Sequence, residues 1–245
     1  MPRFFIEPNQ INNDTVIIVG EDAKHISTVL RMRKDEKIVV CDGQSIDYDC
    51  IIRSINKDSV EVQITDQEMN HAEPNIKVKL YQALPKLDKM EFIIQKCVEL
   101  GIDEIIPIIT KNTIVKIDEP KKGEKKLERW NKISLAAAKQ SKRGKVPKVL
   151  ELRTYSEALK EVNLLDGAII PYEREKITTL KSFVKAFTGK SIGIFIGPEG
   201  GFDPEEVAMA QKMGVQAVTL GNRILRTETA GLSTVSNIIY ELGDE

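Results

Sequence analysis

The stretch GIFIGPEGGFDPEE, residues 193–206, is followed along the chain by TLGNRILRTETAGLSTVSN, residues 219–237. Each stretch is an apolar run that opens into a glycine-bearing loop and then into the start of a helix, which is how α/β proteins build small-molecule sites. Neither stretch has the G-x-G-x-x-G or GK[ST] spacing of the common nucleotide-binding loops. The two loops therefore predict a ligand pocket that differs from the usual nucleotide-binding layout.

From residue 76 onward the sequence alternates between strand and helix patterns, which predicts an α/β domain with a mostly parallel sheet. The predicted strands are residues 76–84, 104–109, 167–172, 191–197 and 215–221. The predicted helices are residues 87–99, 124–142, 156–162, 176–187, 204–213 and 227–241. Ligands of open α/β sheets bind beyond the carboxyl ends of the strands, so the loops at 197–201 and 220–225 are expected to line one pocket. The first strand leads into QALPKLDKMEF, which has no glycine, and this disfavours a Rossmann dehydrogenase or methyltransferase.

The first seventy residues show a different pattern, with short strands separated by turn residues. The predicted strands are residues 15–19, 37–43, 48–55 and 59–65. One predicted helical segment, residues 21–33, interrupts them and ends at the basic pair Arg31 and Arg33. Residues 66–75 are polar, contain Pro74 and lack apolar periodicity, so they are expected to be a linker. This pattern predicts a small all-β unit, a barrel, in front of the α/β domain.

The composition is that of an ordinary globular protein of 245 residues. No segment is apolar enough for a membrane span, and the N-terminus does not resemble a signal peptide, so a cytoplasmic protein without a membrane partner is expected. The three cysteines lack C-x-x-C spacing and lie in apolar segments, which indicates buried, reduced thiols. With two histidines in the chain, neither a zinc site nor a histidine-based triad is expected, and we predict no metal.

The formal net charge is −1, but the charges are segregated along the chain. Residues 1–70 carry 8 Lys/Arg against 13 Asp/Glu, a balance of −5. Residues 111–153 carry 14 Lys/Arg against 5 Asp/Glu, a balance of +9. Such a basic block attracts phosphates, although a solvated lysine-rich helix is an equally good interpretation of charge alone.

Four motifs in order carry a resemblance to a known family: YQALPKLDKMEFIIQKCVELGIDEIIPI, RWNKISLAAAKQSKR, IGPEGGFDPEE and LGNRILRTETA. Together they resemble the small-subunit ribosomal RNA methyltransferase E family of the knotted (SPOUT) methyltransferase superfamily. The resemblance covers nearly the whole chain, because the opening RFF and HISTVLRMRKDEKI are similar to the N-terminal domain of that family.

The resemblance implies a PUA-like β-barrel RNA-binding domain at residues 1–70 and an α/β-knot methyltransferase domain at residues 75–245. It also implies an obligate homodimer, in which the small-residue helix at 228–237 packs in the knot and against the second subunit. S-adenosylmethionine would be held bent in the knot, with its adenine read by loop backbone groups. By position, the implied cofactor-binding residues are Pro171, Tyr172, Glu173, Ile196, Gly197, Pro198, Glu199, Gly200, Gly201, Leu220, Gly221, Ile224 and Leu225.

The family's activity is transfer of a methyl group to N3 of a uridine (uracil 1498 in rRNA numbering) in the decoding region of 16S rRNA, within the assembled 30S subunit. Arg226, and with weaker support Arg223, would stabilise the anion that develops on the uracil carbonyls. Glu228 is a candidate proton acceptor, but a glutamate in the first turn of a helix is more often a capping or ion-pairing residue. The alternatives are a non-catalytic RNA-binding assembly factor and a knotted methyltransferase that acts on tRNA.

The basic block gains meaning from this resemblance. On a helix over residues 124–143, five cations recur at steps of three, four or seven and form one stripe opposite Trp130, whose spacing is more typical of a core anchor than of a base-stacking residue. The candidate RNA-binding residues are Arg31, Arg33, Lys86, Lys89, Arg129, Lys132, Lys139, Gln140 and Arg143. The five cations of the stripe are Lys125, Arg129, Lys132, Lys139 and Arg143.

Overall fold

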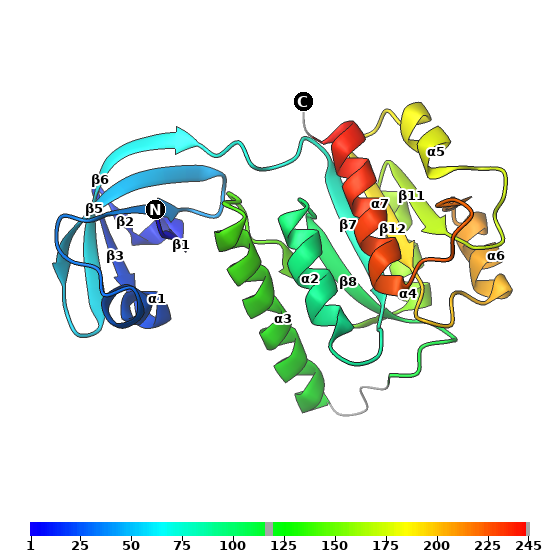
Figure 1. The fold of residues 1–245 in the computed structure, drawn as a ribbon, viewed down its shortest axis with the longest axis horizontal. Helices are drawn as coiled ribbons and strands as arrows, with labels where there is room; N and C mark the ends of the chain where they lie inside the picture. The colour runs from blue at the N-terminus through cyan, green and yellow to red at the C-terminus, as the bar shows by residue number, and fades with distance from the viewer. Residues whose placement is uncertain (116–119, 244–245) are drawn as a thin grey trace. The chain divides into compact units, whose positions relative to one another are not determined.

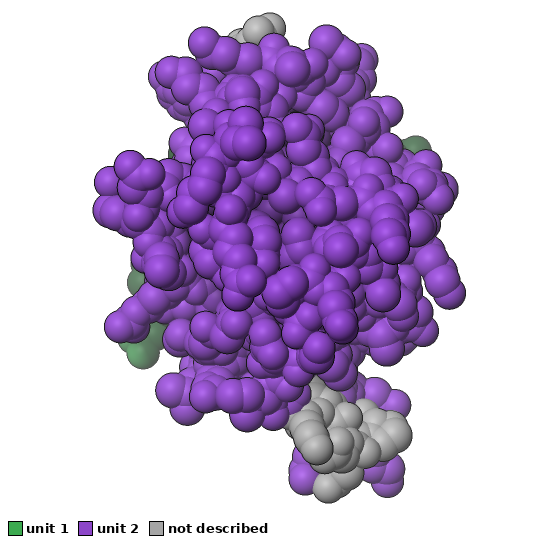
Figure 2. All heavy atoms as spheres, turned by 90° about the vertical axis from the view of Figure 1, so that its right-hand side faces the viewer, with its two compact units in different colours: residues 1–73, 138–146 green, residues 74–137, 147–245 purple. Residues whose placement is uncertain are grey.

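The computed structural model describes residues 1–115 and 120–243 (Figure 1). The chain divides into two compact units, which Figure 2 shows in green and purple. Unit 1 comprises residues 1–73 and 138–146, and unit 2 comprises residues 74–137 and 147–245. None of the helices in the described residues is long and apolar enough to cross a membrane.

Unit 1 is a curled six-stranded sheet in the order β1-β4-β5-β6-β3-β2. Its strands are β1 (Arg3–Phe5), β2 (Ile11–Asn12), β3 (Thr15–Val19), β4 (Lys37–Cys41), β5 (Ile46–Ile55) and β6 (Ser59–Met69). All pairs are antiparallel except β1 with β4. Alternate side chains of β3 point inward, so that Val16 and Ile18 are buried while Ile17 and Val19 are exposed. The four longer strands are those that the alternating sequence pattern predicts.

Two predictions for unit 1 are wrong at their ends. The helical segment at 21–33 is instead a short helix α1 (Gly20–Lys24), whose first residue Gly20 has positive φ, followed by a π-helical turn (His25–Val29). It ends early because Arg31 adopts φ 51°, which no right-handed helix accommodates. The linker predicted at 66–75 begins later, because β6 continues to Met69 by pairing with Ile46 of β5.

Unit 2 is a parallel seven-stranded sheet with the path β10-β8-β7-β12-β11-β13 and with β9 paired to β8. Its strands are β7 (Lys77–Ala83), β8 (Glu104–Ile109), β9 (Lys148–Val149), β10 (Arg153–Thr154), β11 (Gly167–Pro171), β12 (Ser191–Ile196) and β13 (Gln216–Val218). Its helices are α2 (Lys89–Glu99), α3 (Pro120–Gln140), α4 (Tyr155–Lys160), α5 (Leu180–Ala186), α6 (Pro204–Lys212) and α7 (Thr227–Leu242), with α3 extending into unit 1. A 3₁₀ turn covers Glu161–Leu164, and a similar turn in unit 1 covers Pro8–Gln10.

Helices cover both faces of this sheet. On one face, α4 and α6 pack on a core that includes Tyr81 and Phe195, whose rings stack at 4.4 Å between centroids. On the other face, α7 contacts β7, β12, α2 and α5 (Figure 1). The two-sided burial explains why β8, β11 and β12 are nearly continuous apolar runs in the sequence.

Each of the five longer strands and six helices predicted for this domain is present, and the differences lie at their ends. The strand predicted at 215–221 stops at Val218 because the chain turns away into the loop that follows. The helix predicted from residue 176 begins at Leu180, where the Thr179 hydroxyl accepts from the Ser182 amide and caps it. The strands β9 and β10 are each two residues long, which is too short for an apolar period to show in the sequence.

The last segment of the chain returns from the edge of the sheet to its middle. Strand β13 pairs with β11 through Pro171 and Val218, at the sheet edge. Residues 219–226 then lead back to α7, which packs on the central strands β7 and β12. This return brings the loop after β13 beside the loop after β12, so the two quoted stretches share one place in the fold.

Gly231 permits the close approach of α7 to the sheet. A Cβ at this position would stand 3.3 Å from the Gln82 Oε1 atom and 3.9 Å from Ile196 Cγ1. Gly231 therefore serves close packing of α7 on the strands.

Candidate active site

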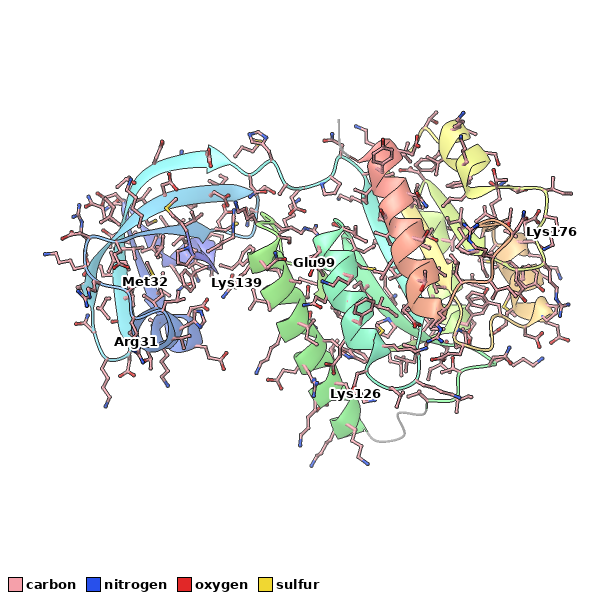
Figure 3. The ribbon with its side chains drawn as sticks, viewed as in Figure 1. Arg31, Met32, Glu99, Lys126, Lys139 and Lys176 are labelled. Atoms are coloured by element: carbon pink, nitrogen blue, oxygen red, sulfur yellow. The ribbon has the colours of Figure 1, made fainter. Side chains whose placement is uncertain are left out.

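A cavity of about 770 Å³ opens at the carboxyl ends of β11, β12 and β13. The loops after these three strands supply most of its lining. All thirteen residues that the sequence predicts as cofactor-binding line it, together with the predicted catalytic residues Arg223 and Arg226. Lys176, labelled in Figure 3, lines it from the loop after β11. The volume is within the usual range for a small-molecule site.

The loop glycines expose backbone to this cavity. Gly201 and Gly221 have φ of 67° and 110°, in the left-handed region that favours glycine. Nothing lies within 4 Å of the place where a Cβ of Gly221 would stand. At Gly197 a Cβ would be 3.2 Å from backbone atoms of Gly201 and Phe202, so that this loop is folded tightly on itself. The arrangement offers N–H and C=O groups to a flat polar ligand.

A buried chain of hydrogen bonds holds the two loops together. The Thr227 hydroxyl donates to the Gly197 carbonyl at 2.6 Å and accepts from Gln82 Nε2 at 3.0 Å. Gln82 is fully buried, and its Oε1 atom has no hydrogen-bond partner among the described residues. Because Gln82 is the second-to-last residue of β7 and Thr227 begins α7, the loop at 197–201 is fixed from both the sheet and the last helix.

Lys89 joins two carboxylates at the rim of the cavity. Its Nζ atom lies 3.1 Å from Glu199 Oε1 and 3.2 Å from Glu228 Oε2. The second contact is an ion pair without hydrogen-bond geometry. The Lys86 backbone N–H also donates to Glu199 Oε1, at 3.1 Å. The start of α2 is therefore attached to the loop after β12 and to the first turn of α7.

These contacts change the proton affinities of Lys89 and Glu199 in opposite directions. The Glu199 carboxylate, and then the Glu228 carboxylate, raises the pKa of Lys89 above its ordinary 10.5. Burial raises the pKa of Glu199, but its own amide, the Lys86 amide and the Lys89 ammonium outweigh burial and lower it overall. The Lys89 contribution to stability is lost only as pH rises through its raised pKa, and the Glu199 contribution only as pH falls through its lowered pKa. Both groups are charged at neutral pH.

The loop after β8 supports the loop after β12 from outside the cavity. The Asn112 Nδ2 atom donates to the carbonyls of Gly200 at 3.3 Å and Gly201 at 3.1 Å. The Lys111 amide donates to Glu206 Oε1 at 2.8 Å. Sequence reasoning missed Asn112, because nothing in TKNT, residues 110–113, distinguishes it from an ordinary loop.

The three predicted catalytic residues are placed differently. Arg226 is the N-cap residue of α7 and lines the cavity, as does the exposed Arg223. Glu228 is in the first turn of α7 with a side chain 17% exposed, and it is absent from the lining residues. Its observed contact is the ion pair to Lys89, which is the more common role that the sequence suggests for such a glutamate.

The apolar part of the lining is incomplete in the chain alone. Ile196 is buried, and Leu220 and Leu225 are partly buried, but Ile224 is 88% exposed. The buried and partly buried side chains therefore form a continuous apolar wall of the cavity, whereas the Ile224 side chain is open to solvent. The lining residues that the sequence prediction omitted are Lys176, Phe202, Thr219, Asn222, Thr227 and Ala230, and it assigned Lys89 to RNA instead. Their adjacency to the predicted loops is the signal that could have found them.

The predicted cationic stripe is wrong at its C-terminal end. Helix α3 ends at Gln140, since Lys142 adopts φ 61°, and Arg143 is 3% exposed and paired with Glu73 at 2.7 Å. Lys139, labelled in Figure 3, is paired with Asp22 at 2.7 Å and lies over the Phe4 ring. Both residues, and the exposed Gln140, belong to unit 1 and are not cavity-lining residues.

The N-terminal part of α3 does present cations to solvent. Lys125, Lys126, Arg129 and Lys132 are exposed, and Lys126 is labelled in Figure 3. Arg129 is paired with Glu91 of α2, and Lys132 with Glu128 one turn earlier. Trp130 is buried at 6% exposure, which confirms that it is a core residue.

In unit 1 the basic pair at the end of the π-helical turn is accessible. Arg31 and Arg33 are exposed, while Met32 between them packs against the core of the sheet. Figure 3 labels Arg31 and Met32. All three cysteines, Cys41, Cys50 and Cys97, are buried and free, which confirms the prediction of reduced thiols.

Comparison with known proteins identifies the class to which this fold and cavity belong. The family model for an RNA methyltransferase domain matches residues 72–239, and that for an RNA methyltransferase PUA domain matches residues 18–65. The protein is therefore an RNA methyltransferase with a PUA domain in front of the catalytic domain.

Individual relatives narrow this class to one family. The chain is 37% identical to ribosomal RNA small subunit methyltransferase E of Bacillus subtilis over 98% of this chain and 97% of the relative. It is 35% identical to the enzyme of the same name from Mesomycoplasma hyopneumoniae, over 98% and 100% of the two chains. A crystal structure of the Neisseria gonorrhoeae enzyme bound to S-adenosyl methionine matches with a TM-score of 0.87 at 32% identity, over 99% and 98% of the chains. The chain belongs to the ribosomal RNA small subunit methyltransferase E family, and the predicted fold class, an α/β-knot (SPOUT) domain behind a PUA-like domain, is confirmed.

Proposed function

We propose that this protein transfers a methyl group from S-adenosylmethionine to N3 of a uridine in 16S rRNA within the 30S subunit, in the cytoplasm. The observation that carries the proposal is the cavity at 196–201 and 220–226, because it brings the two glycine loops and two arginines together in a member of this family. The relatives are named for action on small-subunit ribosomal RNA, and the N. gonorrhoeae enzyme binds S-adenosyl methionine.

The residues of the cavity fit this cofactor. It has a planar adenine, a polar amino-acid end and no phosphate, and the cavity offers bare loop backbone at Gly221 and carboxylates at Glu173 and Glu199. The backbone groups of Leu220 and Leu225 would read the adenine edge, and their side chains and that of Ile196 would cover its face. The bound cofactor supplies an electrophilic methyl group on a sulfonium.

The chain's own residues have two chemical tasks at the uridine. The N3 proton must leave, and the negative charge that develops on the uracil carbonyl oxygens must be stabilised. Arg226 is suited to the second task because it lines the cavity from the fixed N-cap position of α7, and Arg223 on the same loop would assist it. Glu228 remains our candidate proton acceptor, in contact with Lys89.

RNA binding would use exposed cations of both units together with Lys89, which is partly buried and lines the cavity. Lys125, Arg129 and Lys132 on α3, Lys86 and Lys89 on the segment next to the cavity, and Arg31 and Arg33 on unit 1 would contact phosphates, which fixes orientation but not sequence. Arg143 is buried against Glu73, and Lys139 is paired with Asp22 and lies over the Phe4 ring, so we assign both to the structure of unit 1. A homodimer would supply the group that covers exposed apolar side chains such as Ile224 and Tyr240, which are 88% and 79% exposed.

The test is methyl transfer from labelled S-adenosylmethionine to 30S particles that lack the modification, followed by nucleoside analysis by mass spectrometry. We expect 3-methyluridine from the 3′ region of 16S rRNA. Free 16S rRNA and tRNA serve as competing substrates in the same assay. Label in tRNA, or a methyl group on a ribose hydroxyl, would contradict the substrate assignment, and cofactor binding without any transfer would favour a non-catalytic RNA-binding factor.

A further inference from the structure

Leu87 combines a strained backbone with a fully accessible aliphatic side chain. Its φ is 58°, in the left-handed region, and its side chain is 89% exposed. Within residues 1–115 and 120–243, the other non-glycine residues with positive φ are polar or charged: Asn13, Arg31, Asp35, Ser45 and Lys142. A branched aliphatic residue gains nothing from the left-handed region or from exposure to water. Such an outlier points to a role outside the folding of the chain.

The backbone around Leu87 is held in place from both sides. The amide of Lys86 and the ammonium of Lys89 both bind Glu199 Oε1, each at 3.1 Å. Leu87 lies between these two attachment points, and Glu199 belongs to the loop that lines the cavity. The segment is therefore fixed relative to the site, although the Leu87 side chain itself makes little contact with the protein.

The distance from Leu87 to the cavity is short. Lys89 lines the cavity, and a residue two positions away is at most about 7 Å distant between Cα atoms. A leucine side chain can span much of that separation. Leu87 is not itself a lining residue, but it belongs to the segment that borders the cavity at Lys89.

We propose that Leu87 is a substrate-contacting residue that packs against a nucleobase of the RNA at the mouth of the cofactor cavity. The proposal rests on the proposed function, because it assumes that a uridine enters this cavity. Enzymes that act on a base take it out of its stack, and apolar side chains that insert beside the vacated position hold the strand open. Lys86, which immediately precedes Leu87 and is exposed, would bind a phosphate that flanks the base.

The charge of the segment favours RNA over a second copy of this chain as the group that covers Leu87. Three of the four residues in Lys86–Leu87–Asp88–Lys89 are charged. Charged residues are depleted from the cores of protein interfaces, whereas Lys and Arg side chains supply many of the phosphate contacts in nucleic-acid complexes. A subunit interface is accordingly the competing outcome of the test.

The test is the variant Leu87→Gly, because glycine adopts positive φ without strain. We expect its Tm to equal or exceed that of the wild type, its S-adenosylmethionine Kd to be unchanged, and kcat/KM for 30S particles to fall tenfold or more. Asn13→Gly is the matched control, since Asn13 is exposed with φ 55° in unit 1, and its kcat/KM should not change. Leu87→Met, which keeps an apolar side chain, should retain most of the activity.

Unchanged kcat/KM in Leu87→Gly would overturn the proposal. A change in sedimentation coefficient for this variant would also overturn it, because the side chain would then belong to a subunit interface. If the wild type transfers no methyl group to 30S particles, the proposed function itself fails. The variants are then compared by 30S binding, where equal affinities would overturn the contact and a tenfold weaker affinity of Leu87→Gly would support it.

Discussion

Arg226 is the residue on which the proposed chemistry depends most. It lines the cavity and caps α7 without a side-chain hydrogen bond to that helix, so its guanidinium is not committed to the cap. We expect Arg226→Ala to lower the single-turnover methylation rate by about 100-fold or more, as the loss of an oxyanion donor does elsewhere. The S-adenosylmethionine Kd, measured by calorimetry, should change little.

The control for this variant is Arg174→Ala, since Arg174 is exposed, follows the lining residue Glu173 and is absent from the cavity lining. It should leave both quantities unchanged. A large rise in the Kd of Arg226→Ala would mean that Arg226 shapes the cofactor pocket and has no special role in the transition state.

A substitution at Gly221 tests cofactor binding, and the same substitution at Gly214 controls for the backbone strain that it introduces. Gly221 and Gly214 both have positive φ, 110° and 88°, and neither has an atom within 4 Å of a Cβ position. We expect Gly221→Val and Gly214→Val to lose similar stability, roughly 1–2 kcal/mol, because a β-branched residue is strained there. Only Gly221→Val should lose cofactor binding in calorimetry, because only Gly221 lines the cavity. Equal Kd values for the two variants would remove this loop from the cofactor site.

At the scale of elements, the sequence predicts the longer strands and helices because apolar periodicity and caps determine them locally. Asp203 is such a local signal for α6, because its side chain caps the helix by accepting a hydrogen bond from the Glu205 amide. Pro204 at the first helical position and Glu206 in the first turn strengthen the signal. The sequence predicts the ends of elements less well. Arg31 and Lys142 adopt positive φ just beyond their helices, and an arginine or a lysine gives no sign in the sequence that it will do so. The supports of the cavity loops, Gln82 in β7 and Asn112 in the loop after β8, are distant in sequence from those loops and so have no local signal.

The basic part of helix α3 gives a prediction at the same scale. We expect the double charge reversal Arg129→Glu and Lys132→Glu to weaken 30S binding and to reduce the slope of log K against log salt by about 1–2, since each lost phosphate contact contributes about 0.7–0.9. Filter binding across a salt series measures both effects. Lys181→Glu with Lys185→Glu on α5 is the matched control, with the same change of net charge on exposed residues.

A salt slope equal to that of the wild type would contradict the assignment of α3 to RNA, whatever the change in affinity. The reversal at Arg129 also breaks its pair with Glu91, so far-UV circular dichroism must show that the helix is retained. Arg129 is exposed, so the loss of this ion pair alone should have little effect on stability.

At the scale of the whole molecule, the boundary between a β unit and an α/β unit is evident in the sequence because the apolar period changes near residue 76. The sequence does not reveal that residues 138–146 belong to the first unit. Arg143 there is 3% exposed, and its guanidinium binds Glu73, whose carboxylate also accepts from the amides of Gly144 and Lys145. These contacts join positions about seventy residues apart, a separation that no local pattern encodes.

The Glu73 cluster leads to a prediction about how the two units unfold. Removing one partner of a buried ion pair costs about 3–5 kcal/mol, so Glu73→Ala should destabilise unit 1 by that amount. Helix α3 contributes to both units, so we expect unit 2 to lose stability together with unit 1. The single tryptophan, Trp130, is buried in unit 2, and its fluorescence reports that unit alone, while circular dichroism reports the whole chain. Denaturant midpoints from both probes should fall together. The control is Arg53→Ala, which breaks the exposed ion pair between Arg53 and Asp35 and should move neither midpoint appreciably. A fluorescence midpoint of Glu73→Ala that stays at the wild-type value would show that the units unfold independently.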